Sequence, residues 1–143
     1  MPLFLIPFSA FLTQWRWLDF GINPNIFIAM LSAYAFFIDS RQIFILATLI
    51  GIIILKFKPV FEIASLGLAL VGGLILLMRK ALPVFGVVGV GFISAISTFL
   101  FYLLTNYNFI ISHASILFLE SLYNSVLSVA FYLIFKLIYG EER

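Results

Sequence analysis

Long apolar segments, separated by short polar stretches, make up almost the whole chain. The polar stretches contain charged residues, proline, glycine or asparagine, which end helices or form turns. Apolar segments that approach about 20 residues are typical of membrane-spanning helices. The pattern therefore predicts an all-α, polytopic membrane protein of about six transmembrane helices. We expect one integral membrane domain over residues 1–143, with spans at about 3–17, 25–38, 42–55, 60–78, 82–104 and 114–137.

The second and third of these segments are short, at about 14 residues each, and such lengths are marginal for a full crossing. Tilting, embedding among neighbouring helices or local thinning of the bilayer would accommodate them. They could also form a re-entrant pair, which would leave four full spans, but six spans is the preferred interpretation. Pro24 and Asn25 open the second segment, and proline fits the first turn of a helix. Asp39 or Ser40 is the expected cap of the third segment.

Composition supports insertion in a lipid bilayer and excludes several kinds of chemistry. The chain is 64% hydrophobic and 10% charged, whereas soluble domains are about half apolar and about a quarter charged. It has no cysteine and one histidine, so disulfides, thiolate catalysis and iron–sulfur clusters are excluded, and little remains to bind a metal. No block of basic residues indicates nucleic-acid binding. We expect no cofactor.

Basic residues suggest an orientation in the membrane. The first Lys or Arg follows the first apolar segment, so this segment is predicted to be a retained span rather than a signal peptide. With six spans, both termini lie on one side, and that side carries five of the eight basic residues: Arg41, Arg79, Lys80, Lys136 and Arg143. The other side carries Arg16, Lys56 and Lys58. This asymmetry favours cytoplasmic termini in a cytoplasmic (inner) membrane protein.

The last apolar segment carries one polar face. Glu120, Asn124 and Ser128 are spaced by four residues and share one side of a helix. Within a bilayer, such a face must look into protein or a wet cavity. Glu120 would be protonated or paired with a base such as Lys56 or Lys58. We interpret the face as a helix-packing or partner-binding surface; the alternative is a surface glutamate on a helix that begins late.

A second candidate packing surface is the glycine-rich stretch from Gly86 to Thr98. Gly86 and Gly91 belong to a series of small residues at spacings of three and four, which let helices approach closely. The order of these glycines differs from the dinucleotide-binding fingerprint, and no strand precedes them. Helix packing is the expected role.

No motif for catalysis is present. The sequence lacks a Gly-x-Ser-x-Gly nucleophile elbow, a His-Glu-x-x-His zinc motif and a clustered pair of aspartates. The single histidine, His113, would need nearby acids to relay protons, and Glu120 lies about two helical turns away. We therefore predict a protein that is not an enzyme.

Two short motifs resemble the bacterial rod-shape-determining protein family MreD. They are Pro24–Asn25 at the start of the second segment and the Glu-x-x-Tyr-Asn stretch from Glu120 to Asn124, which precedes a basic end. In one respect the chain departs from the family, whose third span often ends in Asp, because Gly51 is followed here by "IIILKFK". The resemblance implies a fold similar to the substrate-binding subunits (S-components) of energy-coupling-factor transporters. It also implies a scaffold that binds an MreC-like membrane protein and the cell-wall (peptidoglycan) elongation proteins and sets cell shape.

Two other functions are compatible with the pattern. The main alternative is a substrate-binding subunit of an energy-coupling-factor-type small-molecule transporter. It would need a closed pocket near the outer surface, and candidate lining residues are Trp15, Trp17, Asn106, Asn108 and Glu120. A sealed pocket of about 300 Å³ or more would favour the binder, and a groove open to lipid would favour the scaffold. An oligomeric channel would need a symmetric ring of polar residues.

Overall fold

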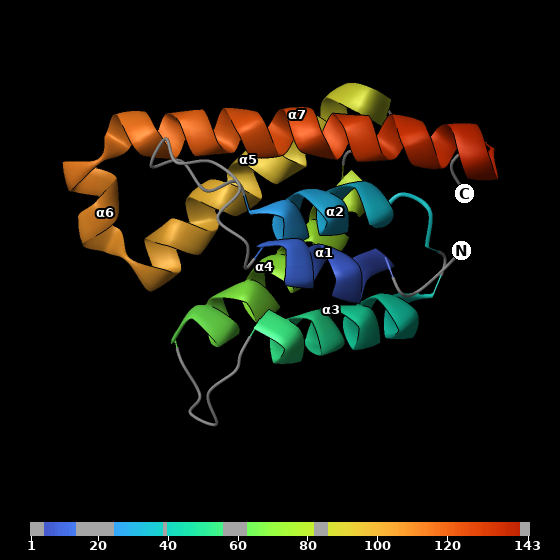
Figure 1. Ribbon diagram of the computed structural model, residues 1–143, viewed down its shortest axis with the longest axis horizontal. Helices are drawn as coiled ribbons and strands as arrows, with labels where there is room; N and C mark the ends of the chain where they lie inside the picture. Colours follow the sequence, from blue (N-terminus) through green and yellow to red (C-terminus); the bar gives the residue numbers. More distant parts are fainter. Residues whose placement is uncertain (1–4, 14–24, 39, 56–62, 82–85, 141–143) are drawn as a thin grey trace.

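The computed structural model describes residues 5–13, 25–38, 40–55, 63–81 and 86–140. Within these ranges the chain is helical and has no strand, as the all-α prediction requires. Figure 1 shows the arrangement of the helices. Their bounds are α1 Leu5–Thr13, α2 Ile26–Tyr34, α3 Arg41–Leu55, α4 Ile63–Ala81, α5 Gly86–Thr105, α6 Tyr107–Ser112 and α7 Ala114–Tyr139.

Three of the described helices are long and apolar enough to cross a membrane: most of α4, and all of α5 and α7. Three such helices indicate a membrane-embedded protein. The other helices are shorter, with 15 residues in α3 and nine each in α1 and α2. A helix of nine residues is about 14 Å long, roughly half of a hydrocarbon core of about 30 Å. The expected span at 25–38 therefore contains a helix too short to cross the bilayer.

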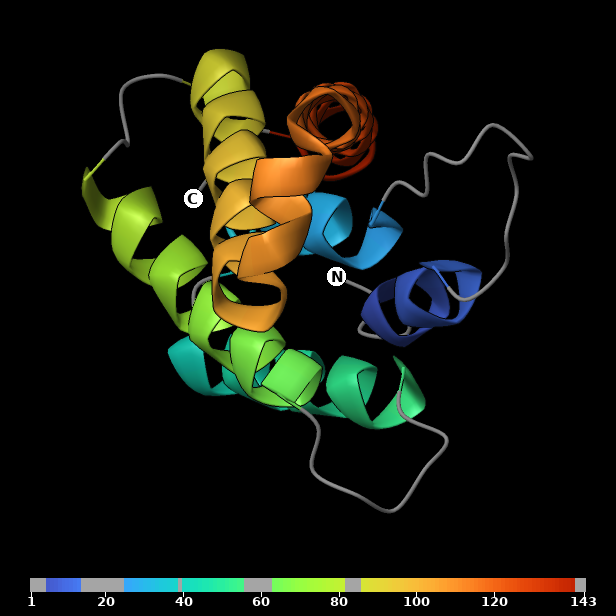
Figure 2. The same cartoon turned by 90° about the vertical axis from the view of Figure 1, so that its left-hand side faces the viewer.

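Helices α5 and α7 form an antiparallel pair, which α6 joins at one end. Figure 1 shows α7 along the full length of the molecule, and Figure 2 shows it end-on beside α5. On its other side α5 packs against α4, and α4 packs against α3. The short helices α1 and α2 complete the bundle, with α1 lying against α2 and α3.

Helix α2 occupies the centre of the bundle. Every residue from Phe27 to Tyr34 is buried, and α2 contacts α1, α4, α5 and α7. Neighbouring helices therefore cover α2 on every side. Its short length is therefore compatible with insertion, because protein rather than lipid surrounds it.

The buried start of α2 needs partners for backbone N–H groups that a helix leaves unpaired. The Oδ1 atom of Asn25 accepts a hydrogen bond from the Ile28 N–H at 3.1 Å. The hydroxyl of Thr13, at the end of α1, accepts one from the Phe27 N–H at 2.9 Å. Asn25 is thus the N-cap of α2. Pro24 lies outside the described residues.

The end of the α2 segment is held by aromatic rings and by an arginine. Phe36 and Tyr132 meet edge to face, with ring centroids 6.1 Å apart, and Phe37 meets Phe135 in the same way at 5.8 Å. Such edge-to-face pairs stabilise packing beyond the area they bury. The Arg79 guanidinium of α4 donates a hydrogen bond to the Ile38 carbonyl. These contacts fix the segment to both α7 and α4.

Helix α3 begins after this turn and approaches its neighbours closely. The Ser40 hydroxyl accepts a hydrogen bond from the Ile43 N–H at 3.4 Å, as expected for a cap; Asp39 lies outside the described residues. At Gly51, an added Cβ atom would lie 2.2 Å from the Phe27 ring of α2. At Gly72 of α4, it would lie 2.8 Å from the Thr48 methyl group of α3. Glycine thus permits these helices to approach one another.

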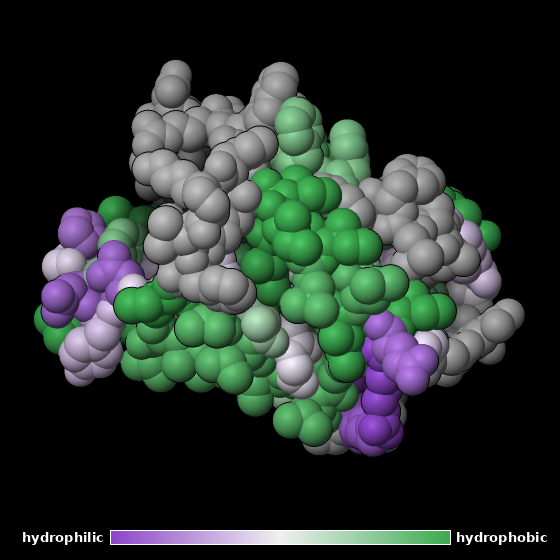
Figure 3. Space-filling model, turned by 90° about the horizontal axis from the view of Figure 1, so that it is seen from below, coloured by the Kyte–Doolittle hydropathy of each residue, from purple (hydrophilic) through white to green (hydrophobic). Residues whose placement is uncertain are grey.

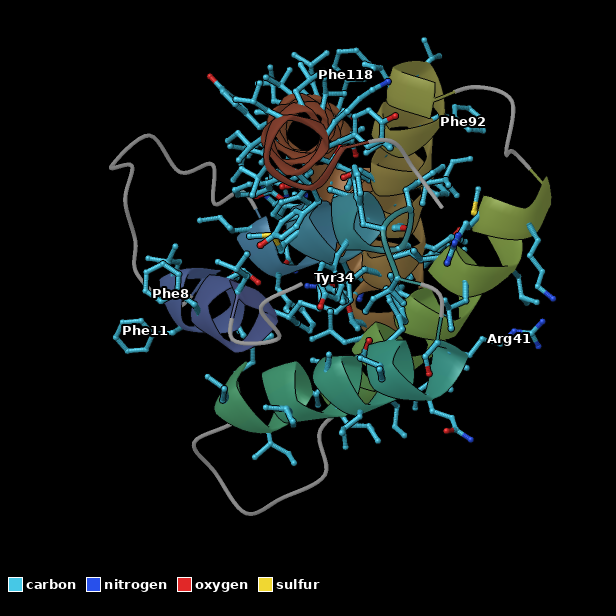
Figure 4. All side chains as sticks on the ribbon, turned by 90° about the vertical axis from the view of Figure 1, so that its right-hand side faces the viewer. Phe8, Phe11, Tyr34, Arg41, Phe92 and Phe118 are labelled. Atoms are coloured by element: carbon cyan, nitrogen blue, oxygen red, sulfur yellow. The ribbon has the colours of Figure 1, made fainter. Side chains whose placement is uncertain are left out.

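Polar residues gather toward the two ends of the molecule. Figure 3 shows hydrophobic residues over the middle of one face and hydrophilic residues toward both ends. Phe8 and Phe11 of α1 point away from the bundle, whereas Tyr34 lies inside it (Figure 4). A hydrophobic band between polar ends is typical of a protein that crosses a bilayer.

The contact between Gly51 and Phe27 yields a stability prediction. We expect Gly51→Ala to lower the free energy of unfolding by about 1–3 kcal/mol, because Phe27 is fully buried and cannot yield to the new methyl group. Unfolding in mixed micelles, followed by circular dichroism, measures the change. Gly73→Ala is the matched control, since a Cβ atom there meets nothing within 4 Å. Equal stability of the two variants would contradict the close α2–α3 contact.

Candidate functional site between helices α5 and α7

The polar face predicted for the last segment lies against α5. Glu120, Asn124 and Ser128 are buried on α7, with exposed fractions of 4%, 0% and 0%. They follow one another at every fourth residue, so they share one side of the helix. Two buried, hydroxyl-bearing residues of α5 bond to this face, Ser94 and Thr98. We call these five residues the polar seam.

Asn124 is at the centre of the polar seam. Its amide nitrogen Nδ2 donates a hydrogen bond to the Thr98 hydroxyl at 2.8 Å. Thr98 in turn donates to the Ser94 carbonyl at 2.9 Å, and the Ser94 hydroxyl donates to the Asn124 carbonyl at 3.0 Å. These three bonds form a closed circuit between the two helices. Such polar contacts fix the helix register where the surroundings are apolar.

One polar atom of the Asn124 side-chain amide lacks a hydrogen-bond partner among the described residues. Its Oδ1 atom is buried and has no hydrogen-bond partner among the described residues, and the same holds for the Ser97 hydroxyl. Because Thr98 donates its proton to Ser94, the Asn124 group that faces Thr98 must be the NH₂ donor. A flipped amide would instead leave two donors unpaired. The polar seam therefore retains an unused acceptor beside α5.

Glu120 bonds to α5 one helical turn before Asn124. The Tyr102 hydroxyl donates a hydrogen bond to its Oε2 atom at 2.5 Å, and Glu120 makes a further interaction. It is the only Asp or Glu among the described residues. Lys56 and Lys58, the partners considered for it, lie outside the described residues. This bond gives the buried carboxyl group of Glu120 a polar partner on the neighbouring helix.

A stack of rings extends from Tyr102 to the end of the molecule. Phe109 of α6 stacks on Tyr102, with ring centroids 4.8 Å apart, and on His113 at 5.1 Å. Asn106 caps α6 by accepting a hydrogen bond from the Phe109 N–H at 3.2 Å. The stack therefore attaches the connection between α5 and α7 to the same tyrosine that holds Glu120.

The glycine-rich stretch has two glycines with different structural roles, Gly91 and Gly86. The Ser125 hydroxyl donates to the Gly91 carbonyl at 3.0 Å, and a Cβ atom at Gly91 would lie 3.4 Å from Val129. Gly91 thus lies in the α5–α7 contact. Gly86 is the first residue of α5, and its φ of 42° is in the left-handed region. Its backbone conformation accounts for glycine at the start of this helix.

Two open grooves lie outside the polar seam. One, of about 340 Å³, runs between α5 and α7 and is lined by residues that include Phe92, Ala95, Phe99, Phe118, Ser121 and Ser125. The other, of about 260 Å³, lies between α3 and α4. Asn106, Asn108 and Glu120, expected around a closed pocket, line neither groove, and Trp15 and Trp17 lie outside the described residues. Both grooves are open to the outside of the bundle.

The arrangement holds helices together rather than presenting reactive groups to a cavity. Among the described residues, no three His, Cys, Asp or Glu side chains gather to hold a metal. The sequence reasoning located the α7 side of the polar seam but missed Tyr102, which holds Glu120. Its spacing of four residues from Thr98 is the signal that could have identified it.

Comparisons of the chain with protein-family models, with curated proteins and with solved structures give no match.

The bond between Tyr102 and Glu120 yields a second prediction. In a double-mutant cycle of Tyr102→Phe and Glu120→Leu, we expect a coupling energy of about 1 kcal/mol, since hydrogen bonds within membranes contribute about 0.6–2 kcal/mol. Reversible unfolding in mixed micelles supplies the four stabilities. Tyr139→Phe replaces Tyr102→Phe in the control cycle, because Tyr139 is 40% exposed at the far end of α7 and should not couple to Glu120. Equal coupling in the two cycles would rule out a specific Tyr102–Glu120 bond.

Proposed function

We propose that the protein is a non-enzymatic, multi-pass scaffold of the cytoplasmic membrane, of the MreD type. In this role it binds an MreC-like membrane protein and the cell-wall elongation proteins through faces of its helices. The proposal rests on the place where the polar side chains of the protein form their hydrogen bonds. They bond across the α5–α7 contact, while the grooves on the outside are apolar and open to lipid. An open groove suits a membrane partner better than it suits a small molecule, which needs enclosure.

The proposal includes six membrane-embedded segments, of which α4, α5 and α7 have the length to cross alone. The remaining segments contain α1, α2 and α3. Protein covers α2 on every side, and the N–H groups at its start bond to Asn25 and Thr13. Irregular backbone at membrane depth is tolerated where protein surrounds it. A short central helix is thus compatible with a multi-pass topology.

Basic residues support cytoplasmic termini. Arg79 bonds to the Ile38 carbonyl, so the end of α4 and the start of α3 lie together. The antiparallel pairing of α5 and α7 places Lys136 at that same end, beyond the Ser128–Val90 contact. All four basic residues that the structure describes therefore lie toward one end: Arg41, Arg79, Lys80 and Lys136. The opposite end carries α6 and His113 and has no described Lys or Arg. By the positive-inside rule, the basic end is cytoplasmic.

This orientation can be tested because the chain has no cysteine of its own. We expect Asn108→Cys to react with a membrane-impermeant maleimide in intact cells or spheroplasts, since Asn108 is exposed on α6. Lys80→Cys, exposed at the basic end, should react only after the membrane is permeabilised. The unmodified chain is the blank. The reverse pattern would place the termini outside, and labelling of both variants from outside would contradict the multi-pass arrangement.

Partner recovery tests the function itself. We expect affinity purification from the native membrane in mild detergent, followed by mass spectrometry, to retain an MreC-like protein and peptidoglycan-synthesis proteins. A Glu120→Leu variant should retain less of them or be less abundant, because Glu120 fixes α7 to α5. Recovery of paired ATPases or a stoichiometric vitamin would instead identify a transporter subunit. Unchanged recovery and abundance in Glu120→Leu would show that Glu120 does not support the partner-binding form.

A further inference from the structure

The groove of about 260 Å³ between α3 and α4 is apolar and open to the outside of the bundle. Its lining includes Ile45 and Thr48 of α3 and Gly72 and Gly73 of α4. Thr48 is the one lining residue with a polar side chain, and its hydroxyl donates to the Phe44 carbonyl at 2.8 Å. At Gly73 an added Cβ atom would meet nothing within 4 Å. The surface above this glycine therefore has room for an apolar chain.

One exposed cation continues each wall of this groove. On α3, Arg41 precedes Ile45 by four residues and Thr48 by seven, so it shares their side of the helix. On α4, Lys80 follows Gly73 by seven residues and shares its side in the same way. Both cationic side chains are exposed, and Figure 4 shows Arg41 pointing away from the bundle.

The two cations lie toward the same end of the groove. Helices α3 and α4 are antiparallel, because the Arg79 side chain of α4 bonds to the backbone that precedes α3. The two helices approach closely where Gly72 meets Thr48. From this contact, Arg41 is about 10 Å away along α3, and Lys80 is about 12 Å away along α4. Because the helices are antiparallel, both distances run in the same direction.

The position of Arg41 is unfavourable for α3 itself. Arg41 is the first residue of this helix, and no acidic residue lies in the first turn. The start of a helix carries partial positive charge, which repels a cation and attracts an anion. The one acidic residue in the described ranges, Glu120, is on α7 and accepts a hydrogen bond from α5; Asp39 lies outside them. The described helices therefore supply no anion to the end of the groove.

An anionic phospholipid combines the two chemistries that this surface requires. Its phosphate lies at the membrane interface, where basic residues at helix ends attract it. Its acyl chains lie in the hydrocarbon region, beside the apolar lining. A zwitterionic lipid would bring a cation of its own to the two cations. A transmembrane helix is selected within membranes by hydrogen bonds and close packing, and the one polar side chain of the lining is already bonded within α3.

We propose that the α3–α4 groove binds an anionic phospholipid of the leaflet at the basic end. The phosphate lies between Arg41 and Lys80, and one acyl chain lies along Gly73. This inference goes beyond the scaffold function and rests only on the embedding of the protein in a membrane.

Native mass spectrometry of the full chain tests the charged part of the site. The protein in micelles is titrated with phosphatidylglycerol or, separately, with zwitterionic phosphatidylethanolamine. We expect phosphatidylglycerol to bind more tightly, and Arg41→Gln and Lys80→Gln each to weaken its binding by about fivefold. Lys136→Gln is the matched control and should leave the affinity unchanged, because Lys136 is a cation of the same end on α7, which packs against α2 and α5.

Filling the groove tests the apolar part of the site. Gly73→Leu adds a side chain without removing a charge, and it should weaken phosphatidylglycerol binding by about threefold or more, since it displaces the acyl chain. Ala95→Leu, in the α5–α7 groove, is the matched control and should leave the binding unchanged. Circular dichroism of each variant verifies folding. Equal affinities for the two lipids, or a loss in Lys136→Gln as large as in Arg41→Gln, would overturn the proposal.

Photocrosslinking in native membranes distinguishes a lipid from a protein occupant. The photoreactive residue p-benzoylphenylalanine is placed at Leu49, which lines the groove and is 48% exposed. We expect phospholipid adducts, with a smaller anionic share when Arg41→Gln and Lys80→Gln are combined. Protein adducts alone would show that a helix occupies the groove and would overturn the proposal. An unchanged anionic share in the combined variant would contradict it as well.

Discussion

Polar groups inside a membrane-embedded bundle have no bulk water to bond with, so their partners must come from the protein. The circuit of Asn124, Thr98 and Ser94 meets this requirement across α5 and α7. Sliding one helix by a turn would break the two bonds that join the helices, from Asn124 to Thr98 and from Ser94 to Asn124, and leave their groups in apolar surroundings. The circuit therefore fixes the register of the pair. That register brings Ser125 to the Gly91 carbonyl and Tyr102 to Glu120.

The buried side of α7 divides into two parts, each with its own neighbour. The part from Glu120 to Ser128 carries polar side chains and bonds to α5. The part that contains Tyr132 and Phe135 is aromatic and packs on the end of the α2 segment. Because both parts lie on one helix, the register that the first part sets also positions the wall against which α2 packs. The position of the central helix α2 thus depends on the polar contact between α5 and α7, in which α2 takes no part.

Sequence reasoning succeeded where a residue's chemistry differed from its surroundings. The helical spacing of Glu120, Asn124 and Ser128 identified a face that the structure buries against α5. Asn25 was expected at the start of a helix, and it caps α2. The extent of α2 could not be predicted, because a segment buried in protein and one exposed to lipid are equally apolar. Tyr102 was missed for a related reason: its aromatic ring does not distinguish a lipid-facing from a helix-facing position, and only its four-residue spacing from Thr98 indicates the second.

This equivalence of lipid and protein interior also limits how a partner can recognise the molecule. Between helices already in the bilayer, apolarity provides no driving force, since lipid tails are as apolar as leucine. Recognition within the membrane must therefore use shape and hydrogen bonds. On α7 the inner face uses both, through Asn124 and its close contact with α5. The outer face of the α5–α7 pair carries an open groove of about 340 Å³ lined mainly by apolar side chains. Hydrogen bonds and close contact at the inner face, and not apolarity, therefore decide how the helices of this bundle pair.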